Sequence, residues 1–239
     1  MSDGRVELPV VTAEFPLFPV AFIGQRPDGA NGRAIAAALA ANREVWVVLS
    51  PELDAMAVLQ QPGLIGTIAW VGELDAGRYV LRGIRRARLE GVGRLSPCAH
   101  AEVSPLTEPE GDDSLRAVTK RLLKRFRQRA PASYGGFSRW LESLPIPDDV
   151  VNLLAGNSGF SPQNQQALLE LPGPDARATR IAELLEGPLV FQLAPPLVAG
   201  GWWLLGVKLW LQSPERWWFW ASVSIALALG LTFAIIWFF

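Results

Sequence analysis

Short apolar runs of strand length alternate with turn-forming residues along the first part of the chain. Residues 6–23 combine β-branched and aromatic side chains with three prolines, which remove backbone donors and predict short or edge strands broken by bends. The glycines and acidic residues of positions 72–77 predict a hairpin connection. The same apolar pattern predicts further strands at residues 45–49, 64–71, 78–84, 86–92 and 101–106.

One amphipathic helix interrupts these strands. Ile35, Ala38 and Leu39 recur at helical spacing, and Asn31 is placed to cap the helix that carries them. A loop is predicted from Pro51 to about Pro62. Several short strands with one helix predict a small, largely antiparallel β domain.

The apolar period becomes helical after residue 114. Ser114 is the predicted cap of a helix over residues 115–129, whose apolar face packs inward. The opposite face carries four cations, Arg116, Lys120, Lys124 and Arg127. This surface suits anionic lipid or an acidic partner, and the plainer interpretation is a solvated face on a core helix. More helices are predicted at residues 137–144, 148–155 (capped by Asp148), 162–171 (capped by Ser161) and 175–185.

The last stretch, residues 217–239, contains no charged residue and predicts a transmembrane helix. At about 1.5 Å of rise per residue it spans roughly 34 Å, enough to cross a hydrocarbon core of about 30 Å. Trp217, Trp218 and Trp220 at one end, and Trp237 at the other, lie where aromatic side chains settle among headgroups. The alternative is a buried core helix.

Residues 187–216, which include Trp202, Trp203 and Trp210, allow two interpretations. Positions 193–211 are long and apolar enough for a second span in a helical hairpin. However, prolines and glycines weaken the start of that span, and its tryptophan pair would lie near the middle of the bilayer. A narrow polar stripe at helical spacing favours a helix lying in the interface instead.

The predicted fold class is therefore α+β, with a small antiparallel β domain, a helical bundle and one or more C-terminal membrane helices. The acidic linker TEPEGDDS marks the change from strands to helices. We divide the chain into a β subdomain (residues 1–107), a helical subdomain (108–186), an interfacial or first membrane helix (187–216) and the transmembrane helix (217–239).

Charge and cysteine content narrow the functional classes. The chain carries 22 Lys and Arg against 23 Asp and Glu, a net charge of −1, so no overall field draws it to nucleic acid. The N-terminal residues lack the basic and apolar regions of a signal peptide. With Lys208 and Arg216 preceding the span, the soluble part is expected on the cytoplasmic side, most simply of a bacterial inner membrane.

Few residues carry candidate chemistry. His100 follows the single cysteine, Cys98, by two positions, and residues so spaced on a strand share a face, which makes a Cys/His hydrolase a distant alternative. The pair is too small for a metal site. A run of four arginines, Arg82, Arg85, Arg86 and Arg88, is interpreted as a solvated strand face. We therefore expect no catalytic residues, metal or cofactor, and a protein that is not an enzyme.

The order of elements resembles the N-terminal, substrate-binding domain of Lon proteases. Leu8-Pro9 and Phe15-Pro16 resemble the family's opening segments, and AIAAALAANREVWVVLS is similar to its helix followed by a strand. Gly66-Thr67-Ile68 and the run YVLRGIRRARL resemble its most specific strands, and FSPQNQQALLEL and PDARATRIAELL its helical bundle. The resemblance covers roughly residues 8–185.

This resemblance implies recognition of unfolded or tagged polypeptide. Lon proteases continue into ATPase and protease modules, whereas no segment of this sequence matches the G-x-x-x-x-G-K-[ST] phosphate loop.

Two hypotheses for the function follow. In the first, the chain is an accessory subunit of a membrane complex that docks through its tryptophans. These are Trp202, Trp203, Trp210, Trp217, Trp218, Trp220 and Trp237. In the second, it is a membrane-tethered adaptor that captures client polypeptides. Membrane lipid and other proteins are the expected partners.

Overall fold

The structure, a computed structural model, describes residues 4–25, 29–50, 52, 54–75, 77–109, 111, 113–131 and 134–186. These residues belong to one compact unit, Met1–Gln192. None of the helices in these ranges is both long and apolar enough to cross a membrane. The predicted interfacial segment, residues 187–216, and the predicted span, residues 217–239, lie outside the described residues.

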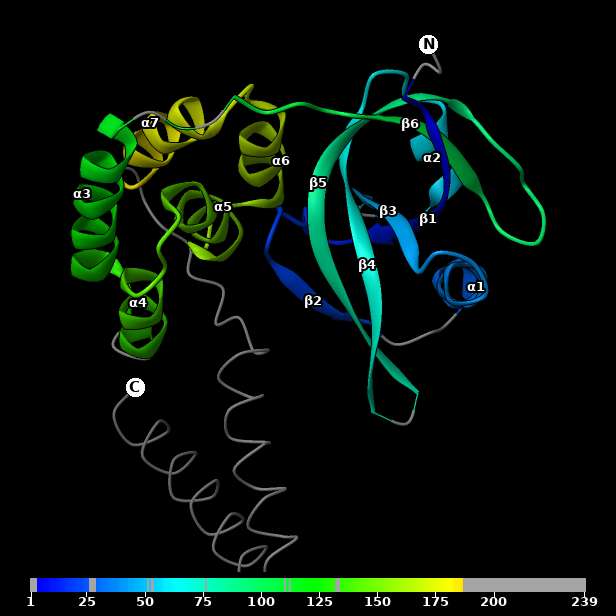
Figure 1. Cartoon of the computed structure of the whole chain (residues 1–239), viewed down its shortest axis with the longest axis horizontal. Coiled ribbons are helices and arrows are strands. Elements are labelled where there is room, and N and C mark those ends of the chain that lie inside the picture. The colour runs from blue at the N-terminus through cyan, green and yellow to red at the C-terminus, as the bar shows by residue number, and fades with distance from the viewer. Residues whose placement is uncertain are drawn as a thin grey trace, which may run out of the picture. The chain divides into compact units, whose positions relative to one another are not determined.

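Six strands form one sheet that closes on itself (Figure 1). Their order is β2-β5-β4-β3-β1-β6, and β6 also pairs with β5, so five strands make a ring that β2 extends at one side. Among the strand pairs in the described ranges, only β1 and β3 run parallel. The strands are β1 (Val6–Ala13), β2 (Phe22–Gln25), β3 (Glu44–Leu49), β4 (Ile65–Asp75), β5 (Arg78–Val92) and β6 (His100–Pro105). The prediction of a largely antiparallel β domain is confirmed.

Two predicted strands are in fact one. The sequence favoured separate strands at residues 78–84 and 86–92, whereas β5 runs unbroken through both. A bulge explains the difference, because Ile68 pairs with Arg85 while the next residue, Ala69, pairs with Gly83. Ile84 is thus an extra residue that the ladder absorbs without ending.

Helix α1 (Gly29–Leu39) covers one face of the sheet, but its predicted cap was wrong. Asn31 lies inside the helix, and its side-chain amide bonds β1 instead. Its Oδ1 accepts from the Thr12 backbone N–H at 3.0 Å, and its Nδ2 donates to the Thr12 carbonyl at 2.9 Å. The predicted loop also contains a short helix, α2 (Ala55–Leu59), capped by the Asp54 side chain. One turn is too short to show a helical period in sequence.

Alternation along the strands separates two apolar cores. In β3, Trp46 and Val48 point into the ring, together with Ile68 and Val58. Val45 and Val47 point the other way and join a second cluster, which extends through α1 and Phe18 into the helices. The second core therefore joins the sheet to the helical half.

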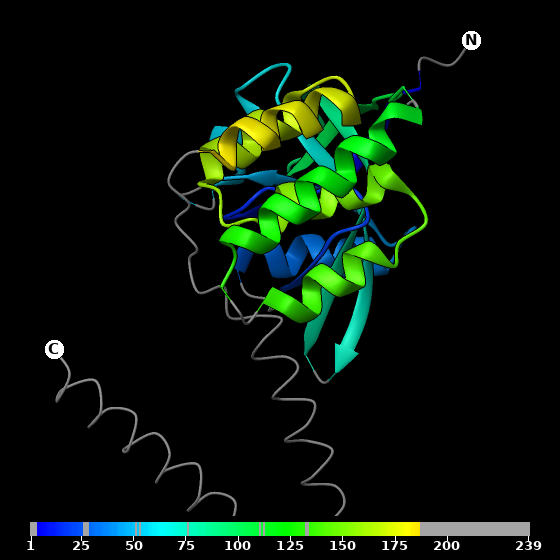
Figure 2. The same cartoon turned by 90° about the vertical axis from the view of Figure 1, so that its left-hand side faces the viewer.

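Five helices form that half and lie beside the sheet in Figure 1 and in front of it in Figure 2. They are α3 (Asp113–Arg129), α4 (Gly135–Glu142), α5 (Pro147–Asn157), α6 (Pro162–Glu170) and α7 (Pro174–Leu184). The Ser161 cap is confirmed, since its side chain accepts from the Asn164 N–H. Ser114 lies inside the first turn of α3 rather than before it. Asp148 likewise lies inside α5, because Pro147 already has the backbone angle of a first helical residue.

Candidate functional site

Three exposed side chains form a row across β2, β5 and β4. Phe22 pairs with Arg82, and Arg82 pairs with Trp70 on the next strand. Directly paired residues of antiparallel strands share a face, so these three side chains point to the same side. Phe22 is 51% exposed and Trp70 is 41% exposed. Two large aromatic side chains therefore meet solvent on one face of the sheet.

Glycine lets the Trp70 indole lie flat along this face. A Cβ added to Gly72 would lie 2.4 Å from the indole Cζ3 atom and 3.2 Å from the Val80 Cγ1 atom. The ring therefore lies over Gly72, where a side chain is missing, and Val80 of β5 borders the same position. We call the set of Phe22, Trp70, Gly72, Val80 and Arg82 the Phe22–Trp70 face. It is a broad apolar surface with one cation at its centre.

Charges of both signs surround this face, since Glu44 of β3 pairs directly opposite Trp70. The Arg43 guanidinium lies 6.0 Å from the centroid of the Trp70 ring, within cation–π range. Burial and the neighbouring Asp148 raise the pKa of Asp149 in α5, and the positive charge of Arg82 partly opposes them. The first turn of α5 is therefore within electrostatic reach of Arg82. A bound segment would therefore meet apolar contacts together with both cations and carboxylates.

An open backbone edge lies next to the same face. β2 ends the strand order, and no strand of the described part of the chain pairs with its outer edge. In Figure 1 it lies on the side of the sheet turned toward the helices. An edge of this kind presents N–H and C=O groups to which an extended peptide can add as a further strand.

Cys98 and His100 are brought together, but not as an activated nucleophile. The Cys98 sulfur lies 3.8 Å from His100 Nδ1, which is itself 3.0 Å from the Cys98 carbonyl oxygen. Both side chains are buried, and burial raises the pKa of the Cys98 thiol, which keeps it protonated at neutral pH. Among the described residues, no three His, Cys, Asp or Glu side chains are grouped so as to hold a metal.

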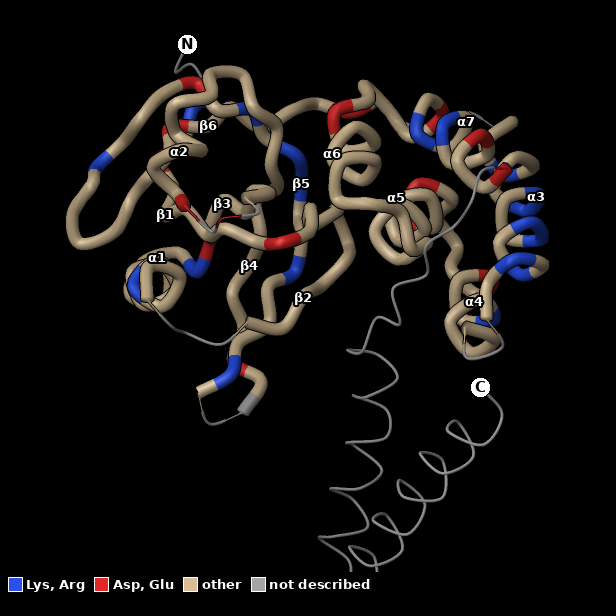
Figure 3. Tube along the Cα trace, turned by 180° about the vertical axis from the view of Figure 1, so that it is seen from behind, with Lys and Arg blue, Asp and Glu red and all other residues tan. Residues whose placement is uncertain are grey.

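The predicted basic surface lies on the outer side of α3 (Figure 3). Arg116, Lys120, Lys124 and Arg127 are all exposed there. Arg127 forms an ion pair with Glu142 at 2.5 Å. Leu122 and Phe126 point inward from the same helix and are buried.

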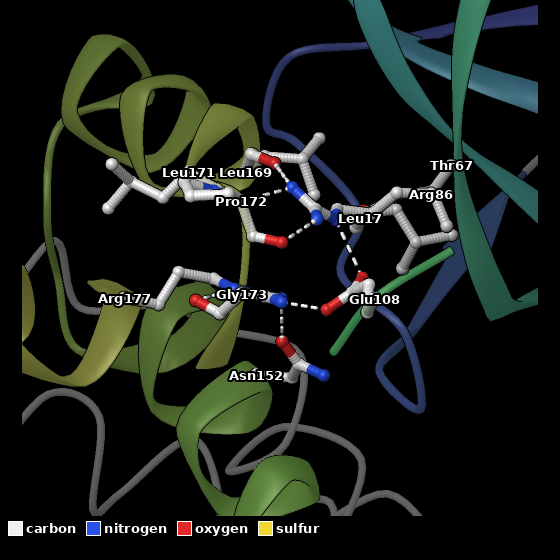
Figure 4. Close-up of polar contacts among 10 residues, drawn as sticks. All are labelled: Leu17, Thr67, Arg86, Glu108, Asn152, Leu169, Leu171, Pro172, Gly173 and Arg177. Atoms are coloured by element: carbon white, nitrogen blue, oxygen red, sulfur yellow. Dashed lines mark hydrogen bonds and ion pairs between the residues drawn. The ribbon is translucent and has the colours of Figure 1, made fainter. Parts of the chain in front are cut away.

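The arginine run on β5 is not one solvated face, as the sequence had indicated. Arg82, Arg85 and Arg88 are exposed, whereas Arg86 is buried between the sheet and the helices (Figure 4). Arg86 Nε donates to Glu108 Oε1 at 2.6 Å, and its terminal nitrogens donate to the carbonyls of Leu169, Leu171 and Pro172. Arg86 thus caps the C-terminal end of α6.

A second buried arginine shares the same acid. Arg177 of α7 donates to Glu108 Oε2 and to the Asn152 side chain. Burial and the charge of Arg86 lower the pKa of Arg177 to about 9, which still leaves it protonated at neutral pH. We call these three residues the Arg86–Glu108–Arg177 cluster. It joins β5, the connection to α3, and α7, so its role is to hold the two halves together.

The seven predicted docking tryptophans, Trp202 to Trp237, lie outside the described residues. The exposed aromatics Phe22 and Trp70 were not among the residues selected from the sequence. Their signal, an aromatic at an outward strand position, becomes visible only when the register of β2, β5 and β4 is known.

Comparisons with known proteins agree on one family. Residues 7–187 match the model of the ATP-dependent protease La (LON) substrate-binding domain. The Lon protease of Trichlorobacter lovleyi is 25% identical over 190 residues, which is 74% of this chain and 22% of that protein. The Lon protease of Chloroherpeton thalassium is 24% identical over 162 residues, or 64% of this chain and 19% of that protein. The chain thus spans about a fifth of the length of these relatives.

Among solved structures, the N-terminal domain of Mycobacterium avium complex Lon protease has a similar fold. It superposes with a TM-score of 0.63 at 20% identity, over 77% of this chain and 100% of that structure. Residues 1–192 form a compact unit of this chain and are the domain used in the tests below. Because the family model covers well over half of the sequence, the chain belongs to the LON substrate-binding domain family.

Proposed function

We propose that this domain binds extended, apolar segments of other polypeptides on the Phe22–Trp70 face. The observation that carries the proposal is that Phe22 and Trp70 are both exposed on one face, where the strand pairing places them in line. They lie beside the edge of β2 that no described strand pairs with. A strand added at that edge would hydrogen-bond through its backbone, which is independent of sequence. Every second side chain of the added strand would then lie over the apolar face. Such a site selects unfolded polypeptide by its exposed backbone and apolar side chains.

The first test is peptide binding by a Trp70→Ala variant of residues 1–192. The probe is a fluorescein-labelled peptide in which Val, Leu and Phe alternate with Ser and Thr, and the measurement is fluorescence anisotropy. Because a central aromatic anchor at an interface contributes more than about 1 kcal/mol, Kd is expected to rise about fivefold or more.

Trp140→Ala is the matched control. Trp140 of α4 is 42% exposed, nearly the same fraction as Trp70, but it lies on a different element and packs against Phe137. Its loss is expected to change Kd by less than about twofold, as for residues outside the central contacts of an interface. Equal losses in both variants, or none in either, would contradict binding at the Phe22–Trp70 face.

The whole chain is proposed to do this at a membrane, with the domain in the cytoplasm. The support is in the sequence: residues 217–239 are long and uncharged enough to span a bilayer. We propose that the chain is non-catalytic, since the candidate Cys98–His100 pair holds a protonated, buried thiol.

A second role, as an accessory subunit of a membrane complex, is favoured by tryptophan content. Seven of the ten tryptophans lie between Trp202 and Trp237, more than two interfacial belts require. If the chain is such a subunit, extraction of the full chain with mild detergent should yield one discrete large assembly with a constant set of proteins by mass spectrometry. A small particle with a varying set of unfolded proteins would instead assign the chain to client capture.

A further inference from the structure

Four exposed cations are grouped on α3. Arg116, Lys120, Arg121 and Lys124 follow one another along about 12 Å of the outer side of the helix. No ion pair joins any of them to another described residue, whereas Arg125 pairs with Glu186 and Arg127 with Glu142. In a chain of net charge −1, this is a local concentration of positive charge.

The described chain also ends against this helix. Arg125 Nη1 lies 3.0 Å from Glu186 Oε1, and Arg129 donates to the Leu185 carbonyl. The segment that leads toward the uncharged residues 217–239 therefore starts beside the C-terminal end of α3.

We propose that the outer face of α3, formed by Arg116, Lys120, Arg121 and Lys124, docks on anionic phospholipid headgroups. The inference rests on the proposed membrane anchoring. The geometry fits lipid better than a folded acidic partner, because the cations lie along one exposed helix side and anionic headgroups demand no fixed arrangement. Each such charge near an anionic surface contributes about 1 kcal/mol, so four give an association constant on the order of 10³ M⁻¹. That is weak alone but effective beside a covalent anchor, as in other two-signal membrane attachments.

The test is co-sedimentation of residues 1–192 with lipid vesicles. Binding is expected to vesicles of phosphatidylcholine mixed with phosphatidylglycerol, not to phosphatidylcholine alone, and it should weaken as salt is added. The double variant Lys120→Gln/Lys124→Gln should bind about 30-fold more weakly, at about 1 kcal/mol for each charge lost. Arg85→Gln/Arg88→Gln, which removes two exposed charges from β5, should stay within about twofold of the unmodified domain.

Each other outcome overturns the proposal. Equal binding to both vesicle types, or equal losses in both double variants, would exclude a lipid-docking role for this face. Tighter binding to polyglutamate than to anionic vesicles, lost in Lys120→Gln/Lys124→Gln, would assign the face to an acidic protein instead. Residues 217–239 are absent from this assay, so its result does not depend on membrane anchoring. Extraction of the full chain tests the anchoring, and the Trp70→Ala variant tests peptide binding.

Discussion

Replacing Glu108 with glutamine is expected to lower the free energy of unfolding of the domain by about 3–5 kcal/mol. Arg86 is 2% exposed and Arg177 is fully buried, and Glu108 accepts hydrogen bonds from both. A glutamine keeps the shape of the side chain but removes its negative charge. Two neighbouring cations are then left buried without a counter-ion, which is far more costly than losing an exposed pair. Urea unfolding of residues 1–192, followed by circular dichroism, measures the change.

Glu142→Gln is the control for this prediction. The Arg127–Glu142 pair has an N–O distance of 2.5 Å, close to the 2.6 Å between Arg86 and Glu108, but its side chains are 46% and 44% exposed. Water screens such a pair, so its loss should cost about 0–1 kcal/mol. Similar midpoints for the two variants would show that the Arg86–Glu108–Arg177 cluster does not stabilise the junction of the two halves.

The sequence predicted most elements of this fold because their signals are local. Turn residues and apolar runs located the strands, and a serine cap followed by Pro162 located α6. The position of Arg86 could not be found in this way. In a regular strand Arg82 and Arg86 would share one face, but the extra residue Ile84 reverses the alternation between them. Arg86 therefore pairs opposite Thr67 and enters the junction, while Arg82 stays beside Trp70.

Long-range partners explain the other differences between sequence and structure. Glu108 belongs to a stretch that composition alone indicates to be an acidic linker, and only the approach of β5 and α7 makes it a counter-ion. Asn31 is a good helix cap by residue type, yet its side-chain amide bonds the backbone of Thr12 in β1 instead. The Phe22–Trp70 face likewise depends on which strands are neighbours. Since each of these roles is set by a residue distant in sequence, residue spacing could not reveal them.

Gly83→Ala is the second substitution expected to have a large effect, a loss of about 3–5 kcal/mol. A Cβ at Gly83 would lie 2.1 Å from the Phe18 carbonyl oxygen and 2.9 Å from its carbonyl carbon, and this obstacle is backbone. The segment that holds Phe18 would have to move, which breaks two hydrogen bonds. These join Val20 N–H to the Gly83 carbonyl at 2.9 Å and Gly83 N–H to the Ala21 carbonyl at 2.8 Å. Overpacking contributes about 1–3 kcal/mol and each hydrogen bond about 1 kcal/mol.

The consequences should reach the helical half, because Phe18 is fully buried and lies against Gly156 of α5. Urea unfolding of residues 1–192 again measures the effect, with Gly24→Ala as the control. Gly24 belongs to β2, which pairs with the same stretch of β5, and a Cβ there would meet nothing within 4 Å. Adding a methyl group in open space should change stability by no more than about 1 kcal/mol. If Gly83→Ala lowered stability as little as Gly24→Ala, the segment carrying Phe18 would not be fixed against β5. Phe18 would then not be what joins the core of the sheet to the helices.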